Sequence, residues 1–150
     1  MGYVLAMAGL GLMIGLAMTG SAVGLVISGQ AAMGLIKKKP EAFGAGLGMA
    51  SPPATQGLYS FVAYILYSSK IATLPDMSLF AGGVTLGAGL AVGIACLVSA
   101  IYQGKICASG LAAYAAGHNV FGQTFVLAAF PEFYAILSLI VSILMLGLIK

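Results

Sequence analysis

The chain has 150 residues, of which 61% are hydrophobic and only 6% are charged, with a formal net charge of +3. Soluble domains average about 45–50% apolar and about 25% charged residues, so this composition excludes a soluble domain and indicates a membrane protein. The positive charge does not indicate a nucleic-acid partner, because three of the six basic residues form a single run, Lys37–Lys39.

Four apolar segments follow one another along the chain, each longer than the roughly 20 residues that a helix needs to cross a bilayer. They cover residues 3–36, 43–69, 78–113 and 121–149. Their connectors are short, so the sequence predicts an all-α membrane protein with four transmembrane helices, arranged as two tandem hairpins in a single membrane domain over residues 1–150. The first segment lacks the charged start and polar cleavage zone of a secretory signal, and we expect it to be a mature span.

The run Lys37–Lys39 predicts the orientation of the chain in the cell membrane. Short loops rich in lysine face the cytoplasm, which places the connector 37–42 there. After two further crossings the connector 114–120 is also expected to be cytoplasmic. Both termini and the connector 70–77 then lie on the opposite side of the membrane.

The two halves of the chain repeat weakly. Ser21 recurs 78 positions later as Ser99, and Gln56 and Glu132 are 76 positions apart. An even number of crossings separates equivalent points, so the two hairpins are expected to run in the same direction, as a parallel repeat.

Residue size differs between the odd and the even segments. Most of the 22 glycines lie in the first and third segments, whereas ten of the 14 Phe and Tyr residues lie in the second and fourth. GxxxG spacings, which let membrane helices approach closely, occur at Gly11/Gly15, Gly20/Gly24, Gly83/Gly87 and Gly89/Gly93. Thin odd helices and bulky even helices make each copy wedge-shaped. Wedge-shaped copies repeated around an axis are predicted to close into a ring with the odd helices inside. The alternative is that membrane helices are simply rich in glycine.

Glu132 is the only acidic residue inside an apolar segment. A carboxylate within a span costs about 2.5–3.5 kcal/mol on insertion scales, so such a residue marks a functional site by default. Counted from the predicted cytoplasmic ends, Gln56 and Gln103 lie at the same depth as Glu132, roughly 15–20 Å into their helices. Three polar residues from three helices therefore meet at one level.

Further oxygen atoms adjoin Gln56. Thr55 precedes it, Tyr59 lies one turn away on the same helix face, and the prolines that begin at Pro52 free backbone carbonyls one turn earlier. Oxygen ligands suit a hard cation, one carboxylate suits a monovalent ion, and no His or Cys cluster supports a transition metal. The alternative for the neutral polar residues is ordinary hydrogen bonding between helices.

Other residues are expected to have structural roles. Cys96 and Cys107 are interpreted as packing residues in one helix, with no disulfide framework. His118 is expected to be a solvated loop residue rather than a ligand. Lys105 is expected to extend its amine toward the membrane interface, and a direct role near the site is the alternative.

Three motifs resemble those of a known family. They are Ser51-Pro-Pro-Ala-Thr-Gln-Gly-Leu-Tyr59, Tyr102-Gln-Gly-Lys105 and Phe130-Pro-Glu-Phe-Tyr134. They are similar, in order and depth, to motifs of the duplicated proteolipid, the K or c subunit, of bacterial V-type (V/A-type) rotary ATPases. The resemblance covers essentially the whole chain.

This resemblance implies a non-catalytic subunit of a rotor ring, built from several copies of the chain and surrounded by membrane lipid. ATP would be hydrolysed in other subunits, and a central-stalk subunit would dock on the cytoplasmic connectors. A stator subunit would supply an arginine, since this chain contains none. One carboxylate per four helices means that fewer ions cross per turn of the ring, so more work is available to move each ion. This ratio suits an ATP-driven pump better than a synthase.

The resemblance also implies an Na⁺ site. In the sodium-pumping members the ion is held by residues that match the carbonyl of Pro52 and the side chains of Thr55, Gln56, Gln103 and Glu132. The tyrosine matching Tyr59 bonds the carboxylate, and Pro52 replaces a residue that is often Leu. We expect one Na⁺ per subunit, carried across the membrane during rotation.

Three alternatives remain open. The same subunit would carry H⁺ if the buried carboxyl alternated its proton without an oxygen cage. A small secondary transporter would instead form a dimer around a hydrophobic substrate cavity. A pore-forming structural proteolipid would have repeated polar residues along one helix, and the even segments lack them.

Overall fold

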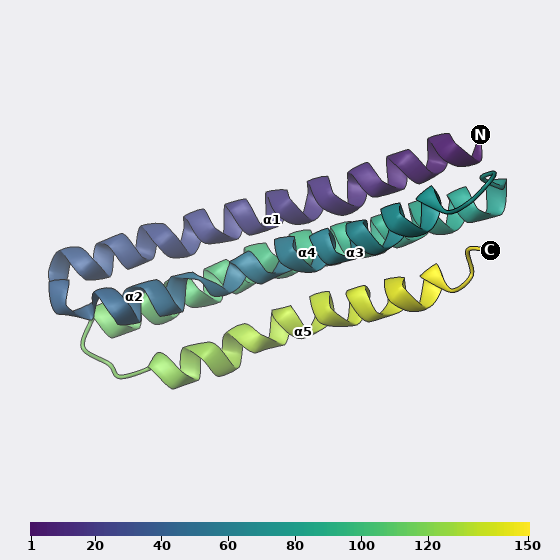
Figure 1. Cartoon of the computed structure of the whole chain (residues 1–150). Helices are drawn as coiled ribbons and strands as arrows, with labels where there is room; N and C mark the ends of the chain where they lie inside the picture. Colours follow the sequence, from purple (N-terminus) through teal and green to yellow (C-terminus); the bar gives the residue numbers. More distant parts are fainter.

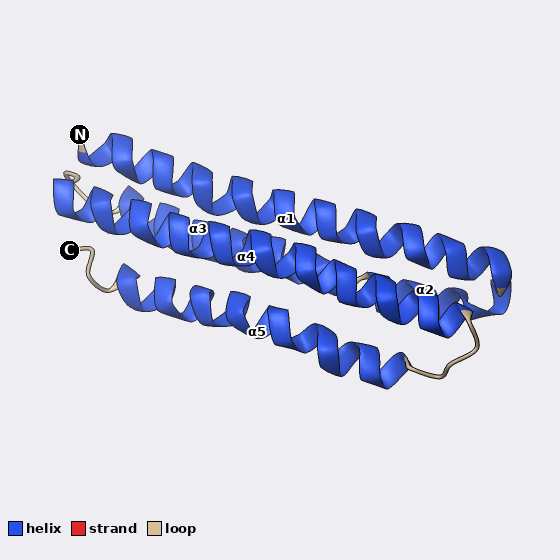
Figure 2. Cartoon of the chain, turned by 180° about the vertical axis from the view of Figure 1, so that it is seen from behind, coloured by secondary structure: helices blue, strands red, loops and turns tan.

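The computed structural model describes all 150 residues, most of them in long helices that lie lengthwise beside one another (Figure 1). The helices are α1 (Gly2–Lys38), α2 (Phe43–Ala50), α3 (Thr55–Ala72), α4 (Leu79–Ala115) and α5 (Phe121–Leu146), with 3₁₀ turns η1 (Pro40–Ala42) and η2 (Pro52–Ala54). Only short loops join them, and there is no strand (Figure 2). The prediction of an all-α protein is therefore confirmed.

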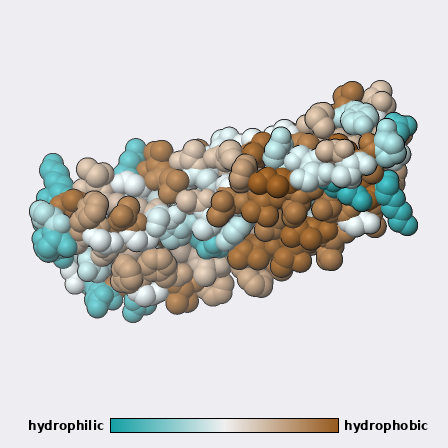
Figure 3. Space-filling view, viewed as in Figure 1, coloured by the Kyte–Doolittle hydropathy of each residue, from teal (hydrophilic) through white to brown (hydrophobic).

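Three of the helices, α1, α4 and α5, are long and apolar enough to cross a membrane. Their bounds lie within a few residues of the predicted segments 3–36, 78–113 and 121–149. Figure 3 shows hydrophilic side chains gathered at both ends of the molecule, with strongly hydrophobic side chains over much of the flank between them. This distribution is the one that a bilayer-spanning bundle requires.

The second predicted segment, 43–69, is helical but not as one regular α-helix. It consists of α2, η2 and α3, because Pro52 and Pro53 have no N–H groups to continue the α-helical bonding pattern. The backbone stays helical but tightens, and the Ala54 N–H donates to the Ser51 carbonyl oxygen over 3.0 Å. The predicted helical segment is thus interrupted by a 3₁₀ turn, and α2 and α3 together run alongside α1 (Figure 1).

The ends of the bundle group as the sequence predicts. Both termini lie at one end, together with the loop between α3 and α4 (Figure 1). The connectors 39–42 and 116–120 lie at the other end.

Glycine sets the closest contact in the bundle, between α1 and α4. A Cβ on Gly20 would lie 2.5 Å from the Cα of Leu97, so no side chain fits between the two backbones there. Two of the four predicted spacings, Gly20/Gly24 and Gly89/Gly93, lie in this contact. By contrast, Gly11, Gly15 and Gly83 have nothing within 4 Å of an added Cβ. The odd segments therefore pair within one chain and still present small residues outward.

Candidate ion-binding site

Gln56, Gln103 and Glu132 meet in one hydrogen-bonded cluster inside the bundle. Gln103 Nε2 donates to Glu132 Oε2 over 3.0 Å, and Gln56 Nε2 donates to Gln103 Oε1 over 2.8 Å. Helices α3, α4 and α5 each supply one of the three. The structure thus brings together the side chains that the sequence places at one depth, and both glutamines are fully buried.

Tyr59 holds the second oxygen of the carboxylate. Its hydroxyl donates to Glu132 Oε1 over 2.5 Å, while Gln103 occupies Oε2. The carboxylate is therefore fixed between α3 and α4 by one donor on each oxygen. The contact that the sequence predicts for Tyr59 is present, and its role in closing an ion-loaded site stays a prediction.

The orientation of both amides follows from their partners. Gln103 Nε2 also donates to the Ala128 carbonyl oxygen over 2.8 Å, so a reversed Gln103 amide would set its oxygen against that carbonyl and the carboxylate. Gln103 Oε1 must then point at Gln56, which has to present its NH₂ group there. The second hydrogen of that NH₂ group goes to Ser99 Oγ, at 3.1 Å.

One atom of this cluster is left without a partner. Gln56 Oε1 is buried and accepts no hydrogen bond. Leaving a buried polar group unpaired costs about 1–3 kcal/mol, and such groups in folded proteins nearly always have a partner. Every nearby amide hydrogen of Gln56 and Gln103 is already used, so a cation beside this oxygen would supply the missing partner.

Thr55 and Pro52 are engaged with each other. Thr55 Oγ1 donates to the Pro52 carbonyl oxygen over 3.0 Å, and the Thr55 N–H bonds the same oxygen. The sequence predicts freed carbonyls from Met49 to Pro52, and that of Pro52 has recruited a hydroxyl. Neither residue hydrogen-bonds Glu132, so their role as ligands stays a prediction.

Ser99 belongs to the cluster but was missed as a site residue by the sequence reasoning. Its hydroxyl accepts from Gln56 Nε2 and donates to the Pro131 carbonyl oxygen over 2.7 Å. Pro131 directly precedes Glu132, so Ser99 connects the Gln56 amide to the backbone that carries the carboxylate. The signal that could have found it was the repeat of Ser21 as Ser99.

The remaining candidates lie outside the cluster. The Lys105 amine sits 4.6 Å from the centre of the Tyr102 ring on the exposed surface, so Lys105 takes no direct part in the site. His118 is exposed, as predicted. Cys96 and Cys107 are free and buried, which confirms their packing role.

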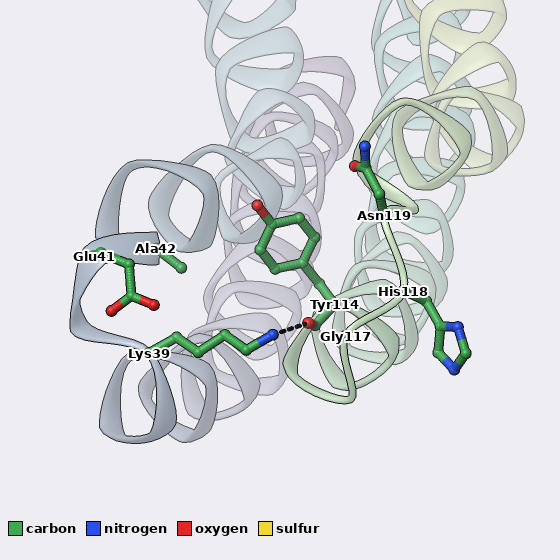
Figure 4. Close-up of a pocket in the computed structure, with 7 residues that line it drawn as sticks. All are labelled: Lys39, Glu41, Ala42, Tyr114, Gly117, His118 and Asn119. Atoms are coloured by element: carbon green, nitrogen blue, oxygen red, sulfur yellow. Dashed lines mark hydrogen bonds between the residues drawn. The ribbon is translucent and has the colours of Figure 1, made fainter.

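A second polar feature lies at the connector end of the bundle (Figure 4). It is a hollow of about 390 Å³, lined by Lys39, Glu41, Ala42, Tyr114, Gly117, His118 and Asn119. Lys39 Nζ donates to the Tyr114 carbonyl oxygen over 3.3 Å and links the first connector to the last turn of α4, while the His118 ring points away from Lys39 (Figure 4). The two connectors that the sequence places on one side of the membrane thus form a common surface.

Comparison with known proteins decides the family. The sequence pattern of the C subunit of ATP synthase matches residues 8–67 and, a second time, residues 86–145. The chain belongs to the ATP synthase C-subunit family. The two matches have the same offset as Ser21 and Ser99, so this C-subunit homologue is duplicated, as the sequence predicts.

Two relatives of this C-subunit homologue are K subunits. The A-type ATP synthase subunit K of Methanocaldococcus jannaschii is 38% identical over 143 residues, which cover 95% of this chain and 62% of the relative. The V-type sodium ATPase subunit K of Enterococcus hirae is 38% identical over 116 residues, which cover 77% of this chain and 73% of the relative. The chain thus spans less than two thirds of the archaeal relative. Both names agree with the predicted proteolipid subunit of a larger ATPase, as opposed to a complete enzyme.

Proposed function

We propose that this chain is a rotor-ring subunit of a V/A-type rotary ATPase and that each copy carries one Na⁺ at Glu132 across the membrane. The unpartnered Oε1 of Gln56, buried in the cluster that holds the Glu132 carboxylate, carries this proposal. The sodium ATPase named among the relatives supports the choice of ion.

The proposed ligands are all oxygen atoms. Glu132 supplies the charge that neutralises a monovalent ion, and Gln56 supplies its free carbonyl oxygen. Gln103 Oε1 accepts one hydrogen bond and keeps a second lone pair. Thr55 Oγ1 and the Pro52 carbonyl oxygen complete the set. Neutral oxygens replace lost hydration around Na⁺, whereas a proton needs only the carboxyl.

The proposed assembly follows from the surfaces left open. Outward-facing Gly11, Gly15 and Gly83 on α1 and α4 fit neighbouring copies in a ring with these helices inside. A stator subunit would bring the arginine that this chain lacks, and lipid would cover the outer helices. The central stalk would dock on the connectors 37–42 and 114–120 on the cytoplasmic side, with both termini on the opposite side. ATP would be hydrolysed in other subunits.

The same ring carrying H⁺ is the second candidate. The hydrogen bond between Thr55 and Pro52 favours it, since two of the five proposed ligands are turned to each other and neither bonds Glu132. A proton-carrying site has no need of either oxygen. The two candidates predict different competition at the carboxyl group.

Na⁺ is expected to protect Glu132 from carbodiimide. The reagent attacks the protonated carboxyl group, and bound Na⁺ displaces that proton. With Gln103→Ala, half-protection is expected to need about tenfold more Na⁺, equivalent to about 1.4 kcal/mol of lost binding. Gln123→Ala, an exposed amide outside the cluster, is the control and should behave as the unmodified ring. Labelling of the purified ring at fixed near-neutral pH measures both. Protection by raised pH but not by millimolar Na⁺ would show a proton carrier.

Tyr59→Phe is expected to weaken the same protection while the ring stays intact. The change removes one of the two donors that orient the carboxylate, and bonds to charged groups contribute about 1.5–3 kcal/mol. The expected loss of Na⁺ affinity is up to about tenfold, since the ion itself restores part of the orientation. Tyr64→Phe on the same helix is the matched control. Equal affinities in the two variants would remove Tyr59 from the site.

A further inference from the structure

One face of α1 lies against the 3₁₀ turn η2, which interrupts the second predicted segment between α2 and α3. We call this interruption the break. Ser21, Gly24 and Ser28 are spaced three and four residues apart, so they share a helix face, and all three are buried. The residues between them in the sequence lie on other faces of the helix and are exposed or half-buried. The face meets the stretch from Ala50 to Gly57, which contains both prolines and the proposed ligands Pro52, Thr55 and Gln56.

Ser28 binds the side of the break that precedes the prolines. Its Oγ lies 2.6 Å from the carbonyl oxygen of Ala50, the last residue of α2. Its contacts to Gly24 and Leu25 carbonyls of its own helix are longer, at 3.1 and 3.3 Å. A hydroxyl has one proton, so the shortest contact identifies Ala50 as its acceptor. Ser28 therefore bonds a different segment in preference to its own helix.

Ser21 binds the other side of the break. The N–H of Gly57 donates to Ser21 Oγ over 2.8 Å. Gly57 is in the first turn of α3, where N–H groups lack a partner within the helix, and Ala54 provides no side-chain cap. Ser21 thus caps α3 from a neighbouring helix. Between the two serines, an added Cβ on Gly24 would lie 2.8 Å from Pro53 Cβ, so glycine is needed for Pro53 to fit.

We propose that Ser21 and Ser28 are positioning residues of the ion site, which fix both sides of the break and thereby set Pro52, Thr55 and Gln56 in register with Glu132. This inference rests on the proposed function and deepens it. Neither serine touches the carboxylate, and each acts through the backbone of the second segment. The site is then assembled by all of its helices, with α1 acting through hydroxyl groups that bind no ion.

The internal repeat supports this role. Ser99 stands in the second half where Ser21 stands in the first, and it bonds the Pro131 carbonyl next to Glu132. The equivalent serine in each half thus bonds the backbone of the next segment, Ser21 next to Gln56 and Ser99 next to Glu132. Ser28 has no such counterpart, since the second half has Ile106 at the same offset. Helix α5 runs unbroken across its single proline, so this second hydroxyl occurs only in the half that contains the break.

The experiment measures the Na⁺ concentration that half-protects Glu132 from carbodiimide in purified rings. Ser28→Ala and Ser21→Ala are each expected to raise it about tenfold. The control is Ser142→Ala, which also removes a fully buried hydroxyl, but one that donates only to Leu139 of its own helix. It is expected to stay within about twofold of the unmodified ring. The labelling rate without Na⁺ and the ring mass are expected to be the same in all four rings.

Ser28→Cys gives a second test, because it leaves no cavity where the hydroxyl was, unlike Ser28→Ala. The thiol fills the site but is a weak donor, so the same rise in Na⁺ concentration is expected. Unmodified affinity in Ser28→Ala, Ser28→Cys and Ser21→Ala would overturn the positioning role. An equal shift in Ser142→Ala would also overturn it, because any buried hydroxyl would then have the same effect. Failure of the proposed function looks different, since the unmodified ring itself would show no protection by Na⁺.

Discussion

Rings built from the Glu132→Gln variant are expected to assemble and to transport no ions above background. Glutamine keeps the shape of the side chain, and its one carbonyl oxygen can still accept from one of the two donors, Tyr59 or Gln103. It lacks the negative charge, and an unpaired cation taken out of water into a low-dielectric interior is strongly disfavoured. Ion flux into vesicles that contain the whole ATPase measures the loss, and native mass spectrometry measures the ring.

The matched control is Asp76→Asn, which neutralises an exposed carboxylate in the loop between α3 and α4, away from the proposed docking surface. It is expected to leave flux unchanged, so that loss of charge in general is separated from loss at the site. Substantial flux through Glu132→Gln rings would sink the assignment of Glu132 as the ion carrier. Loss of the ring itself would instead give Glu132 a role in assembly.

The sequence was sufficient to predict that Gln56, Gln103 and Glu132 meet. Membrane helices are long and nearly parallel, and each residue advances a helix by about 1.5 Å, so depth can be counted from the ends. The cost of a carboxylate inside a span then identifies Glu132 without a structure. The bounds of the apolar segments located the helix ends of α1, α4 and α5 within a few residues.

The hydroxyl contacts could not be predicted, because they depend on how each helix is rotated about its axis. A serine or threonine in a helix usually bonds a carbonyl of its own preceding turn, as Thr19 bonds Gly15. Ser21, Ser28 and Ser99 bond other segments, and only the packing of helix faces determines this. The path of the chain at Pro52 and Pro53 was equally open, since a proline pair frees carbonyls without naming their new partners.

The glycine pattern shows the same limit. The GxxxG spacings predicted close contacts on the first and third segments, but the spacing alone does not name the partner. In the structure Gly20 and Gly24 face α4 of the same chain, whereas Gly11 and Gly15 face outward. Both pairs lie on α1, so one face of this helix packs against α4 while another is left open on the surface of the chain.

The Gly89→Ala variant is expected to weaken the bundle severely. An added Cβ would collide with the backbone of Gly9, including a contact of 2.9 Å to its Cα, and a backbone cannot rotate away as a side chain can. Overpacking typically costs about 1–3 kcal/mol, and the upper end is expected here because both partners are helix backbones. The temperature at which purified rings lose their helical signal and dissociate measures the effect.

The control for this variant is Gly122→Ala on α5, where an added Cβ has nothing within 4 Å. Its dissociation temperature is expected to match that of the unmodified ring, because alanine is also the better helix former. Separation of α1 from α4 in Gly89→Ala would also shift Ser21 relative to Ser99, so surviving rings are expected to bind Na⁺ more weakly. Equal stability of the two variants would show that the α1–α4 contact is looser than the backbone geometry requires.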